Sequence, residues 1–118
     1  QPAELDLVGD VVQVALGDAL RCEERWAEAS TAYDAAVALI ATPEARHWGL
    51  YYSRAITYER QKLWDKAEPD FRQALALNPD QPQVLNYLGY SFLERNENLD
   101  EALSMIERAV AAEPQAGY

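Results

Sequence analysis

An internal repeat constrains this chain more than any other feature of its sequence. Residues 67–79 recur in outline at residues 102–114, with small, large apolar, small and proline residues at the same spacing. The positions that match are Ala67, Phe71, Ala74 and Pro79 against Ala102, Ile106, Ala109 and Pro114. An earlier copy begins at Ala29, with Tyr33 and Ala36 in register. A chain with such a period folds by stacking one small unit on the next, so a single unbroken core is not expected.

Each copy contains two amphipathic helices. Apolar residues recur at helical spacing in each repeated segment and in the stretch before it, and Thr42-Pro43 and Asn78-Pro79 mark helix ends. The predicted helices span residues 6–23, 26–40, 45–61, 64–77, 81–95 and 99–112. Pro69 falls inside the fourth helix, and we expect it within the first turn, where backbone N–H groups have no intrahelical partner.

This pattern resembles the tetratricopeptide repeat, a helix–turn–helix unit with the signature W-x2-L-G-x2-Y, then A-x3-F, then P. The third copy places Leu85, Leu88, Gly89, Phe92, Ala102, Ile106 and Pro114 at those positions. The second copy has Tyr51, Ala55, Tyr58, Ala67, Phe71 and Pro79 there, with Arg54 in place of the leucine. The first copy has Leu16, Gly17, Leu20, Ala29 and Tyr33, with Gln13 in place of the opening aromatic residue.

The resemblance implies an all-α fold, a right-handed α-solenoid of three helix–turn–helix units and six helices. We expect one domain over residues 1–118, with repeats at about 8–43, 48–81 and 82–115 and an insertion around Ile40–Arg46. The small residues of the signature lie where two helices cross closely, so Gly17, Ala55 and Gly89 are expected to face Ala29, Ala67 and Ala102. Because the chain opens with Gln1 and ends just after the third repeat, we expect a segment of a longer array.

The sequence contains few residues or motifs that could support catalysis or metal binding. His47 is the single histidine, and we expect it to be exposed or lightly packed in the linker. Cys22 is the single cysteine and lies beside two glutamates, whereas a nucleophilic cysteine needs electropositive surroundings. The spacing of His, Cys and carboxylates matches no zinc or EF-hand pattern, and the glycines form no phosphate-binding loop. We therefore expect no enzyme, no cofactor and no metal.

The net charge of −10 bears on the class of partner. A surface this acidic repels phosphate, so we expect no nucleic acid as a partner, and neither anionic lipid binding nor membrane insertion. The charge is uneven, because residues 1–40 hold eight acidic and two basic side chains, residues 41–80 hold six of each, and residues 81–118 hold six and two. One cysteine is compatible with the cytoplasm and with a bacterial periplasm, so the compartment stays open.

In the tetratricopeptide repeat family, the inner faces of the first helices bind an extended peptide or a partner helix. Helical spacing then identifies the side chains on those faces. The predicted peptide-binding groove comprises Val14, Asp18, Tyr52, Ile56, Arg60, Asn86, Tyr87 and Tyr90. The resemblance thus implies a non-catalytic module that binds another protein or peptide. The three tyrosines either line this groove or pack between adjacent repeats, and the sequence leaves both interpretations open.

One specialised function of the family is disfavoured. Members that hold the C-terminal carboxylate of heat-shock chaperones use Lys, Asn and Arg side chains at set positions. Here those positions carry Val14, Asp18, Ser53, Gln83 and Tyr87. Because no cationic clamp remains and Asp18 repels a carboxylate, we expect an apolar or mixed peptide as the ligand.

A second function class follows from the last helix. The sequence predicts that Leu103, Ile106 and Val110 stay partly uncovered, because terminal repeats of such arrays normally carry a polar cap. The alternative function is therefore structural, with this end stacking on another repeat or on a second copy to form a homo-oligomer.

Overall fold

The computed structural model describes the backbone of residues 2–112 and the side chains of residues 9–112. Within these residues the chain forms helices and no strand. The elements are α1 (Pro2–Cys22), α2 (Trp26–Ala38), the 3-10 helix η1 (Ala45–His47), α3 (Trp48–Arg60), α4 (Trp64–Leu77), α5 (Pro82–Arg95) and α6 (Leu99–Ala112). The prediction of six α-helices is confirmed. None of the described helices combines the length and apolar character needed to cross a membrane.

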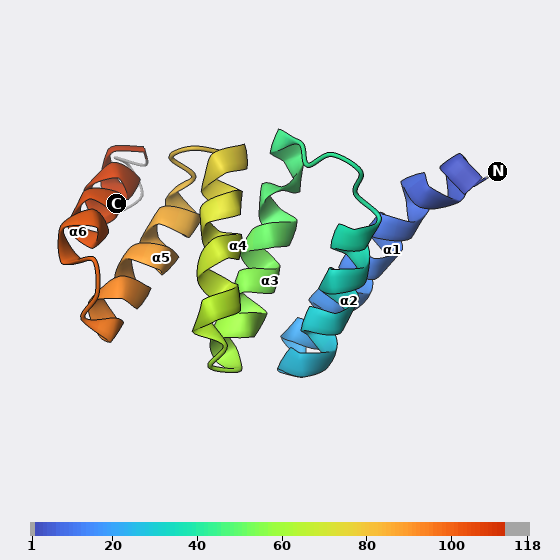
Figure 1. Cartoon of the computed structure of the whole chain (residues 1–118), viewed down its shortest axis with the longest axis horizontal. Helices are drawn as coiled ribbons and strands as arrows, with labels where there is room; N and C mark the ends of the chain where they lie inside the picture. The colour runs from blue at the N-terminus through green and yellow to red at the C-terminus, as the bar shows by residue number, and fades with distance from the viewer. Residues whose placement is uncertain (1, 113–118) are drawn as a thin grey trace.

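The helices stack in chain order along one axis (Figure 1). Helix α1 packs on α2, α3 on α4 and α5 on α6, and α2 and α4 each pack on the first helix of the next pair. The described molecule measures 48 × 26 × 26 Å. Because each pair contacts its neighbours in the row, the predicted all-α solenoid of helix–turn–helix units is confirmed.

The first helix of each pair ends in the same geometry. Glu24, Lys62 and Asn96 all have left-handed backbone conformations, with φ of 60°, 64° and 56°. In the first turn, the Arg25 N–H donates to the Leu20 carbonyl at 2.9 Å, and equivalent bonds follow α3 and α5. This is the Schellman ending of a helix, which favours glycine or asparagine because other side chains are strained there. The first helices of the three pairs therefore end alike, but the third turn has one more residue before the next helix, and its Asn98 is also left-handed, with φ of 46°.

The linker between the first and second pairs corrects one prediction. The 3-10 helix delays the start of α3 to Trp48, three residues later than predicted. His47 is buried, with 7% of its surface exposed, whereas we expected an exposed or lightly packed residue. Its Nδ1 accepts a hydrogen bond from the Glu44 N–H at 2.8 Å, and the Glu44 side chain accepts from the His47 backbone. The histidine is buried because it caps η1.

Pro69 corrects a second expectation. It is the sixth residue of α4 and so lies beyond the first turn. A proline here leaves the Asp65 carbonyl without its intrahelical donor. Both residues lie on the exposed side of α4, where water can hydrogen-bond that carbonyl. The helix therefore continues through Pro69 to Leu77.

The small residues of the signature do allow close crossings. A Cβ added at Gly89 would lie 3.2 Å from the Ala102 carbonyl oxygen and 3.0 Å from Cγ1 of Ile106. At Gly17, the nearest atoms belong to the Tyr33 ring, at 2.5 Å, rather than to Ala29. Gly17 thus leaves space for the ring of Tyr33, which lies four residues after Ala29.

The second and third pairs share one apolar core. It runs from Tyr51 to Ala109, and Phe71, Leu85 and Phe92 within it are fully buried. Aromatic rings join the two pairs, since Trp64 lies 5.8 Å from Phe92 between ring centroids, in an edge-on geometry. A separate, smaller core consists of Ala29, Tyr33 and Ala36 of the first pair and Leu50 of α3.

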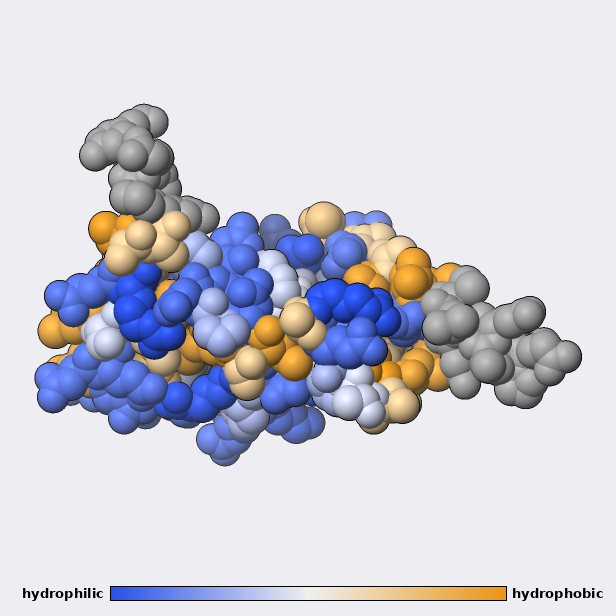
Figure 2. All heavy atoms as spheres, turned by 90° about the horizontal axis from the view of Figure 1, so that it is seen from above, coloured by the Kyte–Doolittle hydropathy of each residue, from blue (hydrophilic) through white to orange (hydrophobic). Residues whose placement is uncertain are grey.

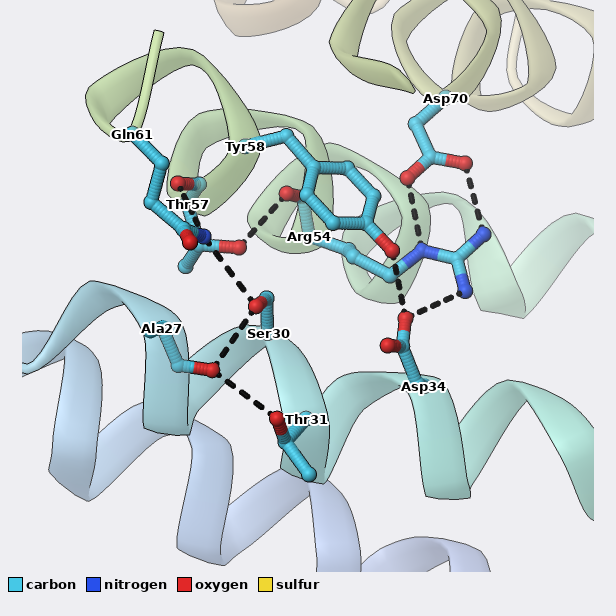
Figure 3. A network of polar contacts seen from close by, with 9 residues as sticks. All are labelled: Ala27, Ser30, Thr31, Asp34, Arg54, Thr57, Tyr58, Gln61 and Asp70. Carbon is cyan, nitrogen blue, oxygen red and sulfur yellow. Dashed lines mark hydrogen bonds and ion pairs between the residues drawn. The ribbon is translucent and has the colours of Figure 1, made fainter. Parts of the chain in front are cut away.

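A polar network crosses the junction between the first and second pairs and extends into the second pair (Figure 3). Arg54 donates to both carboxylate oxygens of Asp70, at 2.7 and 2.8 Å, and to Asp34 at 3.1 Å. The Tyr58 hydroxyl donates to the same Asp34 oxygen at 2.6 Å. Burial alone lowers the pKa of Arg54, but its hydrogen bonds and charge contact with Asp70 outweigh burial and raise that pKa. The arginine that departs from the family signature therefore links α2, α3 and α4.

Candidate functional site

A hollow lies between the first helices of the second and third pairs. It has a volume of about 540 Å³ and is formed by α3 and α5 alone. Its lining residues are Tyr52, Glu59, Arg60, Gln83, Asn86, Tyr87, Tyr90, Ser91 and Glu94. We call this hollow the α3–α5 groove. It contains five of the eight residues predicted for the peptide-binding groove.

The floor of the α3–α5 groove consists of packed aromatic rings. The rings of Tyr52 and Tyr87 lie edge to face, 6.1 Å apart at 86°. Tyr87 stacks on the buried Phe71 at 5.2 Å, and Tyr52 also contacts Trp48 at 6.0 Å. Edge-to-face and stacked contacts of this kind fix ring orientation. Both interpretations of Tyr52 and Tyr87 therefore hold at once, because each ring packs between repeats and also faces the hollow.

One hydrogen bond fixes the wall of the groove to its floor. The Tyr87 hydroxyl donates to a carboxylate oxygen of Glu59 at 2.7 Å, which joins α5 to α3. Burial, followed by this hydrogen bond, raises the pKa of Tyr87 above that of a free tyrosine. The hydroxyl therefore keeps its proton, and keeps donating to Glu59, at alkaline pH where a free tyrosine ionises.

The rim of the groove is exposed and polar. Tyr90 has 54% of its surface exposed, and Gln83, Asn86 and Glu94 are exposed beside it on α5. Across the hollow, the Arg60 guanidinium lies 5.3 Å from the Trp26 ring centroid and remains exposed. The rim thus presents amide donors and acceptors, one cation and one carboxylate around an aromatic floor. Such a surface can hydrogen-bond a peptide backbone and cover an apolar side chain.

Three residues predicted for the groove lie elsewhere. Val14 packs against the small core of the first pair, and Ile56 packs against the core of the second and third pairs. Asp18 accepts a hydrogen bond from the Tyr33 hydroxyl at 2.6 Å and pairs with Arg21 at 3.7 Å. These side chains face their own repeat, so the first pair adds nothing to the α3–α5 groove.

Sequence reasoning missed Ser91, which is buried in the groove wall. The signal was present, because Ser91 follows Tyr87 by four residues and therefore lies on the same helix face. Glu59, Gln83 and Glu94 also line the groove, at helical spacing from its tyrosines.

The predicted assembly surface divides into two parts. Leu103 and Val110 are 55% and 65% exposed. Ile106 is half-buried and lies against Gly89 of α5, because it occupies the position of Phe71 in the third repeat. Its main contact is therefore inside its own helix pair.

Features that could support catalysis or metal binding are few in the described part of the chain. Residues 9–112 contain no group of three or more His, Cys, Asp or Glu side chains placed to hold a metal ion. Cys22 is exposed and His47 is buried in the η1 cap.

Comparison with known proteins agrees with this geometry. A model of the tetratricopeptide repeat family matches residues 52–117, more than half of the chain. The chain belongs to the tetratricopeptide repeat family, whose repeats generally mediate protein–protein interaction and whose members are typically non-catalytic scaffolds.

A solved structure shows the same fold. The crystal structure of MamA superposes with a TM-score of 0.78 at 20% sequence identity. The match covers 94% of this chain and 63% of the MamA chain, so the chain spans less than two thirds of the length of that protein.

Proposed function

We propose that this chain binds a peptide segment of another protein in the α3–α5 groove, without catalysis. The observation that carries the proposal is the pairing of a rigid aromatic floor with an exposed polar rim in one hollow of about 540 Å³. A preformed surface of this kind reduces the entropy cost of binding, since its rings are already ordered.

The charges of the groove favour an apolar or mixed ligand. Glu59 already accepts a hydrogen bond from Tyr87, and Glu94 and Arg60 have opposite charges at the rim. No cluster of cations lines the hollow, so a free carboxylate would find little attraction there. We expect a peptide with at least one apolar side chain over Tyr52 and Tyr87, and with backbone groups near Asn86.

The family supports the class of this function, because tetratricopeptide repeats generally mediate protein–protein interaction. The second and third repeats, which form the groove, are also the part of the chain that the family model matches.

The experiment starts from a displayed library of random peptides of about 12 residues. Peptides enriched on the wild-type chain are synthesised and titrated by calorimetry against wild type, Tyr90→Ala and Asn86→Ala. We expect Tyr90→Ala to weaken binding about tenfold or more, because exposed tyrosines often dominate such surfaces. Arg60→Ala is compared with Arg46→Ala, since both arginines are exposed and Arg46 lies outside the groove.

Two outcomes would overturn the proposal. One is enrichment of peptides that bind Tyr90→Ala and Asn86→Ala as tightly as wild type while both variants remain folded by circular dichroism. The other is equal loss of binding in Arg60→Ala and Arg46→Ala, which would indicate general charge attraction rather than recognition in the groove.

A further inference from the structure

We propose that the α3–α5 groove continues into a basic end, and that its ligand is a peptide with an acidic side chain about four residues from its apolar one. The basic end consists of Lys62, Lys66 and Arg95, which line a hollow of about 420 Å³ beside Trp64. This inference rests on the proposed function, because one peptide occupies both the groove and the basic end. It adds the charge of the partner, which the repeat family does not specify.

A further hollow joins the α3–α5 groove to the basic end. It has a volume of about 280 Å³. It shares Glu59, Ser91 and Glu94 with the groove, and Lys62, Trp64 and Arg95 with the hollow at the basic end. Because neighbouring hollows share lining residues in this way, one continuous depression runs from Tyr52 to Lys66.

The cations of this region differ from the others in the chain because they have no acidic partner. Seven of the ten basic side chains form ion pairs with Asp or Glu. The three that form none within residues 9–112 are Arg60, Lys62 and Lys66, which are all exposed. The chain has 20 acidic side chains, so possible partners inside the molecule are plentiful. Three unpaired cations beside one depression therefore favour an acidic group on the ligand.

Aromatic rings orient the cations of the basic end. The guanidinium carbon of Arg95 lies 4.8 Å from the ring centroid of Trp64, and Nζ of Lys66 lies 5.6 Å from that of Tyr58. Such contacts hold a cation in place without neutralising its charge. Arg95 also pairs with Glu97 at 3.3 Å, but the two side chains are 41% and 44% exposed, so a ligand carboxylate can reach Arg95.

Two carboxylates determine where the acidic side chain of the ligand lies. Glu59 and Glu94 line both the α3–α5 groove and the joining hollow. They repel an acidic side chain placed over Tyr52 or Tyr87. The hollow at the basic end has three cations and a single carboxylate, that of Asp65. The apolar side chain of the ligand therefore belongs over the tyrosines and the acidic one beyond Glu94.

Helix α3 gives the spacing between the two side chains of the ligand. Tyr52 and Arg60 lie at opposite ends of this helix, about 12 Å apart along its axis. An extended peptide covers about 3.3 Å per residue, so it spans this distance with about four residues. The direction of the peptide decides whether the acidic residue comes before or after the apolar one.

The surface around the middle of the molecule also favours recognition by charge. On the face shown in Figure 2, hydrophilic residues, in blue, predominate in the middle of the row of helices, and hydrophobic residues, in orange, gather toward its ends. Helix α3 lies in the middle of this row (Figure 1). A partner that extends from the groove over this face thus meets mostly polar side chains, so complementary charge extends the contact better than apolar area does.

The test begins with the sequences selected from the displayed library of peptides of about 12 residues. We expect Asp or Glu to be enriched about four positions from an apolar residue. One selected peptide is synthesised with a C-terminal amide, so that its only carboxylates are side chains, and again with the matching amide residue at the enriched position. Calorimetry should show about tenfold weaker binding of the second peptide to wild type. Binding of the acidic peptide should weaken between about 50 and about 500 mM NaCl.

Lys62→Gln/Lys66→Gln tests the basic end directly. This variant should bind the acidic peptide about tenfold less tightly than wild type does, and the amide peptide equally well. Arg46→Gln/Arg108→Gln is the matched control, because it removes the same two charges at exposed positions outside the depression. It should bind both peptides as wild type does. Circular dichroism confirms that both variants are folded.

The outcomes separate this inference from the proposed function. Peptides that need Tyr90 but show no enrichment of Asp or Glu, or that bind Lys62→Gln/Lys66→Gln as tightly as wild type, would overturn this inference alone. Binding only of peptides with a free C-terminus would also overturn it, because the carboxylate would then belong to a chain end. Acidic peptides that need Lys62 and Lys66 but not Tyr90 would overturn the proposed function, since the basic end would then bind without the groove. A library that yields no binding peptide would contradict both.

Discussion

The two junctions of this solenoid join equivalent helix pairs by opposite chemistry. Between the first and second pairs, Arg54 and Tyr58 of α3 hydrogen-bond to Asp34 of α2, and Arg54 also binds Asp70 of its own pair. Between the second and third pairs, the junction is an apolar core in which Phe71 and Phe92 are fully buried. The helix pairs follow one repeat pattern, but Arg54 replaces the signature leucine at the first junction, so the pattern specifies the backbone of a junction without specifying its chemistry.

The two junctions should also contribute differently to the stability of the chain. Burial of apolar area stabilises the second junction in proportion to the area removed from water. A buried ion pair adds little net stability, because desolvation offsets the attraction, but removing one partner leaves the other charge costly. We therefore expect the second junction to supply most of the stability and the first to be sensitive to unmatched changes.

The largest expected effect is at the apolar junction. Phe71→Ala removes a fully buried ring that contacts Tyr52, Trp64 and Tyr87. We expect a loss of about 3–5 kcal/mol in the free energy of unfolding, the usual cost of an aromatic cavity. Urea unfolding followed by circular dichroism measures it. Leu103→Ala, at an exposed position, is the control and should change stability by less than about 0.5 kcal/mol. Equal losses in the two variants would contradict the assignment of the main core.

Changing Arg54 alone should lower the stability, whereas changing Arg54 and Asp70 together should restore most of it. Arg54→Leu restores the signature leucine but leaves the Asp70 carboxylate, 6% exposed, without its partner. We expect a loss of about 2–3 kcal/mol, somewhat below the range for a fully buried pair because Arg54 is partly exposed.

The double variant Arg54→Leu/Asp70→Met sharpens this test. It copies the third repeat, where Leu88 and Met105 occupy the two equivalent positions and are buried. Its stability should return to within about 1 kcal/mol of wild type, because well-packed apolar residues can replace a buried ion pair. A double variant that is less stable than Arg54→Leu alone would show that the polar network itself holds this junction together.

The next effect concerns the close helix crossing of the second pair. Ala67 is fully buried in α4, and Ala67→Leu adds three carbons where no space exists. Overpacking of this kind costs about 1–3 kcal/mol. Ala76→Leu, on the exposed side of the same helix, is the matched control and should be nearly neutral. An unchanged urea midpoint for Ala67→Leu would contradict the packing that the repeat pattern predicts.

Most of the fold was predictable because it depends on local periodicity. Apolar spacing and the Asn78-Pro79 signal placed the helices within a few residues, and the small residues at Gly89 and Ala102 lie at a crossing as expected. Pro69 was expected within the first turn, but the helix continues through it because Pro69 and Asp65 lie on its exposed side.

The site was predictable only in part. Helical spacing places Asn86 and Tyr90 on the groove face, but it cannot tell which repeats approach closely enough to form a hollow. Asp18 lies outside the α3–α5 groove, and spacing within α1 could not show its contact with Tyr33, which lies 15 residues away on another helix. The burial of His47 depends on a cap in an irregular linker, where no period exists to extrapolate.

The smallest effect tests how the first repeat differs from the second at one shared position. Tyr33 occupies the place of Phe71, and its hydroxyl bonds to Asp18 and Arg21. Burial, together with the hydrogen bond to Asp18, raises the pKa of Tyr33 from its ordinary 10.0 to about 12. Above pH 10 the folded state therefore holds a proton that the unfolded state has lost, so the free energy of unfolding falls as pH rises toward 12.

Tyr33→Phe removes that titrating group and keeps the ring. We expect it to cost on the order of 1 kcal/mol at pH 7 through the lost hydrogen bonds, and to lose less stability than wild type between pH 10 and 12. Urea unfolding at a series of pH values measures the cost at pH 7 and the loss of stability between pH 10 and 12. If the two proteins lost the same unfolding free energy between pH 10 and 12, the pKa of Tyr33 would not be raised in the folded state. In that case the first repeat would be held by its apolar contacts alone, as the second repeat is at Phe71.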